Sequence, residues 1–235
     1  MELSGARALV AGATGVLGGA ITAEVAGRGA REALAGRDPS RLARAAQAYP
    51  GAPTVRFDAC DPAPCARADR DTSAAFPGLD AVVAFGAVAL GAAQEVGDEV
   101  AEHLPAVSHL APAAFVRAAL DVLRPGSTVA AVTGVVAGRP QPRMADHSAS
   151  QAALRAWLET VRRETRSAGV GVLEVRPEHL DTGFAQRPVA GTAPPLPRGG
   201  DPRQLAAAVE DAPAADAEPV RTGPDRTPVV EGRAR

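Results

Sequence analysis

The chain has 235 residues, 46% of them hydrophobic, which is enough for one α/β domain with a buried core. A formal net charge of −2 and the lack of a long uncharged apolar run give no reason to expect nucleic acid or a membrane as partner. The first residues lack a signal-peptide pattern, and the cysteines, Cys60 and Cys65, form no CxxC, so a reduced, cytoplasmic setting is expected.

The first predicted element is a strand from Ala6 to Val10, followed by a glycine-rich turn and a helix that reaches about Gly27. Gly12 would form a tight turn, Gly15 would let the backbone approach a pyrophosphate, and Gly18 would let the helix pack closely. The unpaired N–H groups of the first helical turn would face the phosphates. This pattern favours a dinucleotide site over a purely structural turn.

A second parallel strand is predicted from Ala30 to Ala35, and it leads into Gly36 and Arg37. Arg37 stands where the ribose end of a dinucleotide would lie. An acidic residue there would favour NAD, whereas an arginine can pair with a 2′-phosphate, so NADP is favoured. The alternative is an ordinary exposed arginine. Asp38 then caps a helix predicted from Arg41 to Tyr49.

Strands continue to alternate with helices along the rest of the chain. Further strands are predicted at 54–57, 79–84, 127–132 and 171–175, and helices at 108–123, 151–167 and 203–209. The ranges 60–75 (loop and helix), 88–107 (ambiguous), 186–200 (mobile loop) and 227–230 (edge strand) complete the pattern. It predicts a single α/β domain with a Rossmann-type, doubly wound parallel sheet. Residues 1–184 would form the core, and 185–235 a partly flexible substrate loop and C-terminal segment.

From about Ser4 to Glu210 the chain resembles the short-chain dehydrogenase/reductase family. The features that carry the resemblance, in the family's order, are the glycine turn, Arg37, Asp58, Ala84-Phe85-Gly86, Pro177 to Thr182 and Asp201-Pro202. Val16 departs from the usual glycine spacing, and Glu178 replaces a glycine. The resemblance implies an NADP(H) cofactor, either working or only structural. Its implied contacts are Gly12, Thr14, Gly15, Gly18, Arg37, Asp58, Gly86 and Thr182.

The family's Asn-Ser-Tyr-Lys tetrad is absent under any alignment. The chain contains no lysine and no asparagine, and its one tyrosine, Tyr49, falls on the second predicted helix. The corresponding positions hold Ser108 for asparagine, Gly134 for serine (with Thr133 beside it), His147 for tyrosine and Gln151 for lysine. Loss of this machinery should cost several orders of magnitude in rate, since proton transfer alone contributes about 10²–10⁴-fold.

His147 is the residue best suited to replace the missing tyrosine. Its imidazole can move protons near neutral pH, because the reference pKa of histidine is about 6.5. Thr133 and His179, from neighbouring loops, complete the predicted catalytic group. The histidines have no HxxxH or HxH spacing, so we expect no metal site. The alternative is that His147 is a drifted residue in an inactive site.

Three functions remain open. The favoured one is an atypical enzyme that performs proton transfer, dehydration, isomerisation or cyclisation on a small organic molecule with His147 as acid/base. The second is an atypical NADP-dependent carbonyl oxidoreductase in which water or Arg155 replaces the lysine. The third is a catalytically inactive ligand-binding homologue. The resemblance implies a homodimer or homotetramer. The Ala-, Arg-, Gly- and Pro-rich composition suggests a GC-rich bacterial genome, which is associated with secondary metabolism. The sequence does not identify the substrate.

Overall fold

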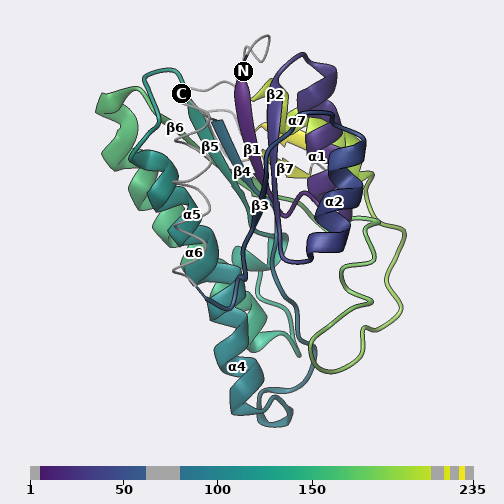
Figure 1. The fold of residues 1–235 in the computed structure, drawn as a ribbon. Helices are drawn as coiled ribbons and strands as arrows, with labels where there is room; N and C mark the ends of the chain where they lie inside the picture. Colours follow the sequence, from purple (N-terminus) through teal and green to yellow (C-terminus); the bar gives the residue numbers. More distant parts are fainter. Residues whose placement is uncertain (1–5, 62–79, 213–219, 223–227, 231–235) are drawn as a thin grey trace.

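The protein folds into a mostly parallel β-sheet covered by helices on both faces (Figure 1). A computed structural model describes residues 6–61, 80–212, 220–222 and 228–230. The eight strands lie in the order β3-β2-β1-β4-β5-β6-β7-β8, and only β8 runs antiparallel to its neighbour. The strands are β1 (Arg7–Ala11), β2 (Arg31–Gly36), β3 (Thr54–Arg56), β4 (Asp80–Val83), β5 (Thr128–Val132), β6 (Gly171–Arg176), β7 (Val220–Thr222) and β8 (Pro228–Val230).

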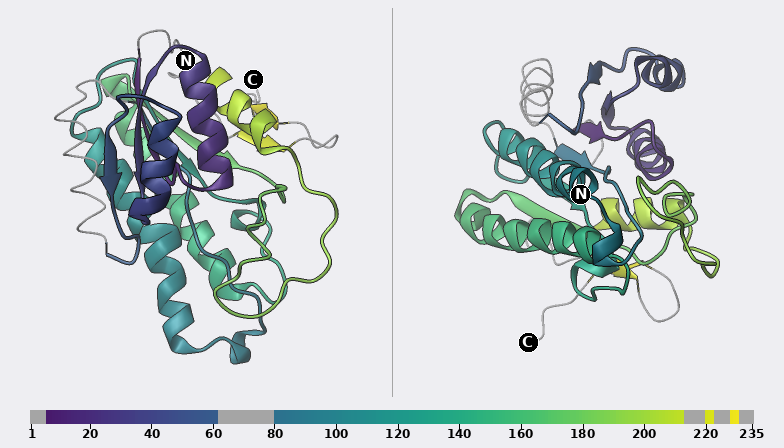
Figure 2. Two further views of the ribbon diagram at one scale, coloured as in Figure 1. Left: turned by 45° about the vertical axis from the view of Figure 1, so that its right-hand side comes forward. Right: turned by 90° about the horizontal axis from the view of Figure 1, so that it is seen from below.

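The helices form two layers, with α1, α2 and α7 on one face of the sheet and α5 and α6 on the other (Figure 2). The α-helices are α1 (Val16–Gly27), α2 (Pro39–Gln47), α4 (Asp98–Pro105), α5 (Ala111–Leu120), α6 (Ala145–Thr165) and α7 (Pro202–Asp211). The short helical turns are η1 (Ala93–Glu95), the π-turn η2 (Ala106–Leu110), η3 (Val135–Ala137) and η4 (Arg166–Ala168). Within the described ranges, no helix has the length and apolar character needed to cross a membrane.

The apolar run of β1 shows why the sheet is buried on both sides. Leu9 and Ala11 belong to the core cluster that also contains Phe115 of α5 and Leu158 of α6. The intervening residues Ala8 and Val10 belong to the cluster under α1 and α7. Because a parallel sheet is covered on both faces, its central strands are apolar at successive positions rather than alternating. This confirms the predicted doubly wound architecture.

The boundaries of several predicted elements were wrong. Helix α6 begins at Ala145 rather than at Gln151, without a side-chain cap at Met144, so His147 lies in its first turn. The ambiguous range 88–107 contains η1 and α4, and the chain is helical from Asp98 through η2 to the end of α5. Strand β7 was missed, whereas the predicted edge strand is β8. The range predicted at 60–75 lies mostly outside the described residues.

The strand order creates a switch point between β1 and β4. The chain runs from β1 outward to β2 and β3, then returns to place β4 on the other side of β1. In open α/β sheets, ligands bind outside the carboxyl ends of the strands at such a point. The predicted nucleotide turn, after β1, and the Ala84–Gly86 segment, after β4, both lie there.

Candidate functional site

The glycine turn after β1 packs against the segment that follows β4. Gly12 has a φ of +92°, which favours glycine, and a Cβ there would lie 2.5 Å from the carbonyl oxygen of Ala84. The N–H groups of Gly12 and Ala13 donate to the carbonyl oxygen of Ala35 at 2.9 and 3.1 Å. The turn is thereby tied to both neighbours of β1, and no side chain fits at Gly12.

The amino end of α1 is open toward the switch point. Gly15 is the N-cap, no side chain caps the helix, and its first turn contains no acidic residue. Uncapped N–H groups and the positive end of the helix dipole favour an anion at this place. Gly18 permits the close packing of turn and helix, since a Cβ there would lie 2.1 Å from the carbonyl oxygen of Gly12. This geometry fits a pyrophosphate.

Two neighbouring glycines of α1 provide a matched test of this packing. We expect Gly18→Ala to lower the free energy of unfolding by about 2 kcal/mol, because its methyl group would collide with backbone. At Gly19 a Cβ would lie 3.6 Å from the carbonyl oxygen of Ala13, an ordinary contact. Gly19→Ala should therefore be neutral or stabilising, since alanine favours helix by about 1 kcal/mol. Urea unfolding measures both, and equal stabilities for the two variants would contradict the close packing at Gly18.

The predicted adenosine contacts lie around the ends of β2 and β3. Arg37 is exposed directly after β2. Thr14 lies against the end of the same strand, with its Oγ1 3.1 Å from the position of a Cβ on Gly36. Asp58 is exposed after β3, where its carboxylate accepts a hydrogen bond from the N–H of Cys60 at 3.0 Å. A positive group and a carboxylate thus follow two adjacent strands, as the sequence predicts.

The backbone of Ala87 is the centre of the polar contacts after β4. The Oγ of Ser108 accepts from the N–H of Ala87 at 3.0 Å and donates to its carbonyl oxygen at 3.2 Å. The Nδ1 atom of His147 lies 3.0 Å from the same carbonyl oxygen. Ser108 belongs to the π-turn η2, a distortion that is frequent at functional sites. Residues predicted at the asparagine and tyrosine positions therefore meet on one carbonyl group.

The hydrogen bond to Ala87 determines which nitrogen of His147 carries the hydrogen, and burial determines the charge of the ring. A carbonyl oxygen only accepts, so Nδ1 must carry the hydrogen and donate it. The imidazole is 5% exposed, and burial lowers its pKa, while the bond to Ala87 opposes that shift. The ring is therefore neutral at pH 7, and its Nε2 atom has a free lone pair. A neutral imidazole in this state is a proton acceptor.

Gln151, one helical turn after His147, carries an unsatisfied polar atom. Its side chain is 5% exposed, and Oε1 has no hydrogen-bond partner among the residues that the structure describes. Its Nε2 lies 3.9 Å from the position of a Cβ on Gly86. A buried acceptor left unpaired costs about 1–3 kcal/mol. This amide is therefore suited to receive an O–H or N–H group of a ligand at the switch point.

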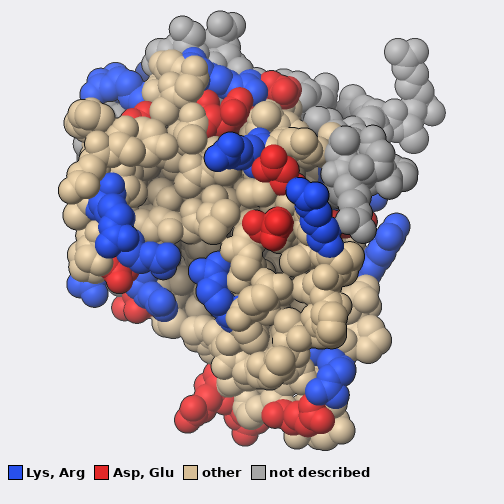
Figure 3. All heavy atoms as spheres, turned by 90° about the vertical axis from the view of Figure 1, so that its right-hand side faces the viewer, with Lys and Arg blue, Asp and Glu red and all other residues tan. Residues whose placement is uncertain are grey.

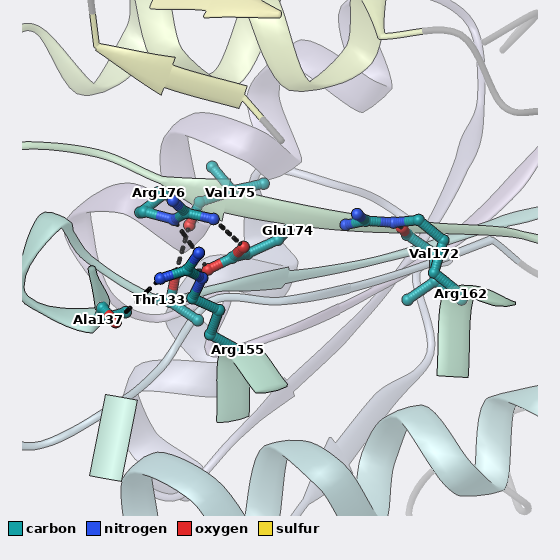
Figure 4. Close-up of polar contacts among 8 residues, drawn as sticks. All are labelled: Thr133, Ala137, Arg155, Arg162, Val172, Glu174, Val175 and Arg176. Carbon is teal, nitrogen blue, oxygen red and sulfur yellow. Dashed lines mark hydrogen bonds and ion pairs between the residues drawn. The ribbon is translucent and has the colours of Figure 1, made fainter. Parts of the chain in front are cut away.

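The hydroxyl of Thr133 is engaged away from His147. It donates to Oε1 of the buried Glu174 at 2.7 Å, and Glu174 is paired with Arg176 (Figure 4). No hydrogen bond joins Thr133 to His147 in the described part of the chain. The predicted catalytic role of Thr133 stays a prediction. In this arrangement its hydroxyl anchors the end of β5 to β6.

Arg155 turns toward the loop that contains η3. Its Nη1 donates to the carbonyl oxygen of Ala137 at 3.4 Å (Figure 4). Within the described ranges, no hydrogen bond connects its guanidinium to His147 or Gln151. The geometry therefore does not support Arg155 as a replacement for the family's lysine.

The loop after β6 carries the remaining predicted residues. His179 is half-buried, and its carbonyl oxygen accepts from the N–H of Gly200 at 2.9 Å. Its imidazole makes no hydrogen bond to His147 among the described contacts. The Oγ1 of Thr182 accepts from the N–H of Phe184 at 3.4 Å. The ring of Phe184, which sequence reasoning did not single out, lies 6.4 Å from the imidazole of His147, centroid to centroid.

The same loop, predicted to be mobile, is bonded near its middle to the segment after β4. The N–H of Val189 donates to the carbonyl oxygen of Val88 at 2.8 Å, and the N–H of Leu90 donates to that of Ala190 at 2.9 Å. Gly191 has a φ of +77°, and a Cβ there would lie 1.4 Å from the carbonyl oxygen of Leu90, so the loop passes directly over the backbone of Leu90. Figure 3 shows this side of the molecule as largely uncharged surface with separate basic and acidic groups. The large apolar side chains exposed on the loop are Phe184, Val189 and Leu196.

Three contributors to this region were missed by sequence reasoning. Ala87 acts through its backbone, for which side-chain identity gives no signal. Phe184 follows the Thr182 segment, but its proximity to His147 depends on the path of the loop. Glu174 did have a signal, because it is the one charged residue in the predicted strand from Gly171 to Val175. A charge inside a buried strand requires a partner, here Arg176.

Comparison with known proteins establishes the family. Residues 6–191 match the family described as short chain dehydrogenase, so the chain belongs to the short-chain dehydrogenase/reductase family. No curated protein matches the chain. A solved short-chain dehydrogenase from Streptomyces avermitilis is 25% identical, with 95% of this chain and 90% of that one covered and a TM-score of 0.83. A short chain dehydrogenase from Burkholderia cenocepacia J2315 in complex with NADP is 26% identical, with 89% and 90% covered and a TM-score of 0.77.

Proposed function

We propose that this protein is an enzyme that binds NADP(H) and transfers a proton on a small organic substrate through His147. The observation that carries the proposal is the buried imidazole, held by its Nδ1 at 3.0 Å from the carbonyl oxygen of Ala87. This contact leaves Nε2 as a base. The reactions that suit such a base are proton removal next to a carbonyl, dehydration, isomerisation and cyclisation.

The residues at the switch point fit a dinucleotide. Gly12 and Gly18 leave no room for side chains, and the amino end of α1 is open. The relative from Burkholderia cenocepacia was solved with NADP, which supports the same cofactor here. The residues that would hold it are Gly12, Thr14, Gly15, Gly18, Arg37, Asp58, Gly86 and Thr182. When bound, a nicotinamide supplies hydride transfer, or it only shapes the site.

The side chains around His147 divide the work of proton transfer. The Nδ1–H bond to Ala87 orients the ring and stabilises the imidazolium that forms when Nε2 accepts a proton. Nε2 returns the proton when the reaction needs an acid. The amide of Gln151 receives a polar hydrogen of the bound ligand, and Phe184 provides an apolar surface near the imidazole. Because Gln151 is neutral, it does not lower the pKa of a neighbouring group as a lysine would.

An atypical NADP-dependent oxidoreductase is the second candidate. The open amino end of α1 and the neutral imidazole favour it, since a base takes the proton from an alcohol during oxidation. A change in nicotinamide absorbance during turnover distinguishes this reaction from proton transfer alone. Turnover of substrate without such a change supports the first candidate.

Arg37→Asp tests the preference for NADPH. Charge-assisted bonds to the 2′-phosphate would be lost, so we expect about 10–100-fold weaker NADPH binding and little change for NADH. Titrations that follow nicotinamide fluorescence measure both affinities. Arg44→Asp, with the same charge change at an exposed position of α2, is the control.

Equal loss of both nucleotides in Arg37→Asp would remove Arg37 from the phosphate site. If the wild-type protein bound neither NADPH nor NADH, the glycine turn would be only structural. The function would then be cofactor-free chemistry at His147 or a pure binding role.

A further inference from the structure

Two arginines from different elements meet beside the exposed Gly138, at the end of the η3 loop. Measured from the position of a Cβ on Gly138, the Nη1 of Arg155 lies at 3.2 Å and the Nη1 of Arg176 at 3.7 Å. Arg155 comes from α6 and Arg176 from the end of β6. Figure 4 shows both guanidinium groups turned toward the same place, next to Glu174. Only a glycine leaves this place open.

The two guanidinium groups differ in their partners. Arg176 is bonded to the buried Glu174, with its Nε 3.1 Å from Oε1. Glu174 also accepts a hydrogen bond from the hydroxyl of Thr133, so its carboxylate is bonded to both Arg176 and Thr133. Arg155 has one long hydrogen bond to a carbonyl, and no ion pair is found for it in the described part of the chain. Of the two guanidinium groups, that of Arg155 therefore lacks a carboxylate partner among the described residues.

We propose that Arg155 and Arg176 form a binding site for a small oxyanion, such as a carboxylate, sulfate or phosphate group, at Gly138. The guanidinium fork matches oxyanion geometry, and partial burial strengthens its hydrogen bonds. Gly138 is exposed, so an anion reaches the two groups from solvent. The site is separate from the nucleotide turn, because it lies on the loop between β5 and α6 rather than at the amino end of α1.

Thermal unfolding in increasing sodium sulfate tests the site, with sodium chloride at equal ionic strength as reference. Wild type should show saturable stabilisation by sulfate beyond that of chloride. Arg155→Gln removes the guanidinium that has no ion pair among the described residues, and it should weaken the apparent affinity about tenfold or more. Arg163→Gln removes an equal charge from an exposed position of the same helix and should bind as wild type does. Sulfate at the amino end of α1 contributes equally to all variants, so the difference between them reports this site.

Gly138→Ala is the second variant, and it changes no charge. Its backbone φ of −118° accepts alanine, while the added methyl group occupies the place between the two guanidinium groups. It should weaken sulfate binding as Arg155→Gln does. If Arg155→Gln does not fold, Gly138→Ala by itself tests the oxyanion site. Absence of a saturable sulfate effect in wild type, or the same effect in all variants, would overturn the proposal.

Discussion

His147→Ala is expected to lower turnover by about 10²–10⁴-fold, the usual contribution of a proton-transferring side chain. The variant removes the buried imidazole whose Nδ1 is held by the carbonyl oxygen of Ala87, and with it the Nε2 atom proposed to accept the proton. Nucleotide affinity should stay unchanged, because the glycine turn and Arg37 are untouched. The loss is measured as kcat/KM on a substrate that the wild-type protein turns over.

The control for this variant is His103→Ala. His103 lies on α4, and its Nδ1 contacts the Sγ of Cys60 rather than the site. It should turn over substrate at the wild-type rate. Activity of His147→Ala equal to that of wild type would make His147 a bystander.

The pH dependence of the wild-type rate follows from the same imidazole. Burial lowers the pKa of His147, so the neutral base is present from below pH 6.5 upward. The rate in the direction that needs a base should therefore rise with pH, reach its plateau at a lower pH than an ordinary imidazole would give, and stay level. A rate that continued to rise toward about pH 10 would indicate a phenol-like group instead.

Stability is expected to fall as pH rises from about 5.5 to 8, because two buried carboxyl groups must ionise in the folded state. Glu210 is 1% exposed, and burial raises its pKa to about 7. Burial likewise raises the pKa of Asp80 to about 6. Between the unfolded and folded pKa values of such an acid, the folded state binds more protons. Its contribution to stability is therefore full below the unfolded pKa and is lost as pH rises through the folded pKa.

Glu210→Gln separates this effect from other titrations. Glu210 contributes about 2 kcal/mol to the difference in unfolding free energy between pH 5.5 and pH 8, so the variant's difference should be smaller by that amount. His147 acts in the opposite sense below pH 6.5, since its pKa is lowered, but equally in both proteins. Urea unfolding at the two pH values measures the change. Asp211→Asn, at an exposed neighbour on α7, is the control and should leave the pH dependence intact. An unchanged pH dependence in Glu210→Gln would contradict the raised pKa of Glu210.

Local patterns made the position of the proposed nucleotide turn predictable. The glycines at 12, 15 and 18 and the apolar run before them are signals within one short segment, and the structure places them at the switch point. The alternation of strands and helices likewise predicted the doubly wound sheet. The start of α6 was not predictable in this way, because Met144 provides no side-chain cap.

The proposed catalytic half of the site depends on contacts between distant segments. His147 and Ala87 are brought together by α6 and the segment after β4, and the acceptor is a backbone atom. The charge of Glu174 is buried on β6 because Arg176 and Thr133 satisfy it. Such pairings depend on how the layers pack rather than on local spacing, so the sequence indicates the residue types but not their partners.

The protonation state of His147 in solution shows whether this imidazole is a neutral base. Nitrogen NMR of histidine-labelled protein, with His147→Ala for assignment, reports the tautomer and the pKa of this ring. We predict hydrogen on Nδ1, a free Nε2 at neutral pH, and a pKa below the ordinary value of about 6.5. Hydrogen on Nε2 alone, or a pKa above that value, would contradict a neutral base held on the carbonyl oxygen of Ala87.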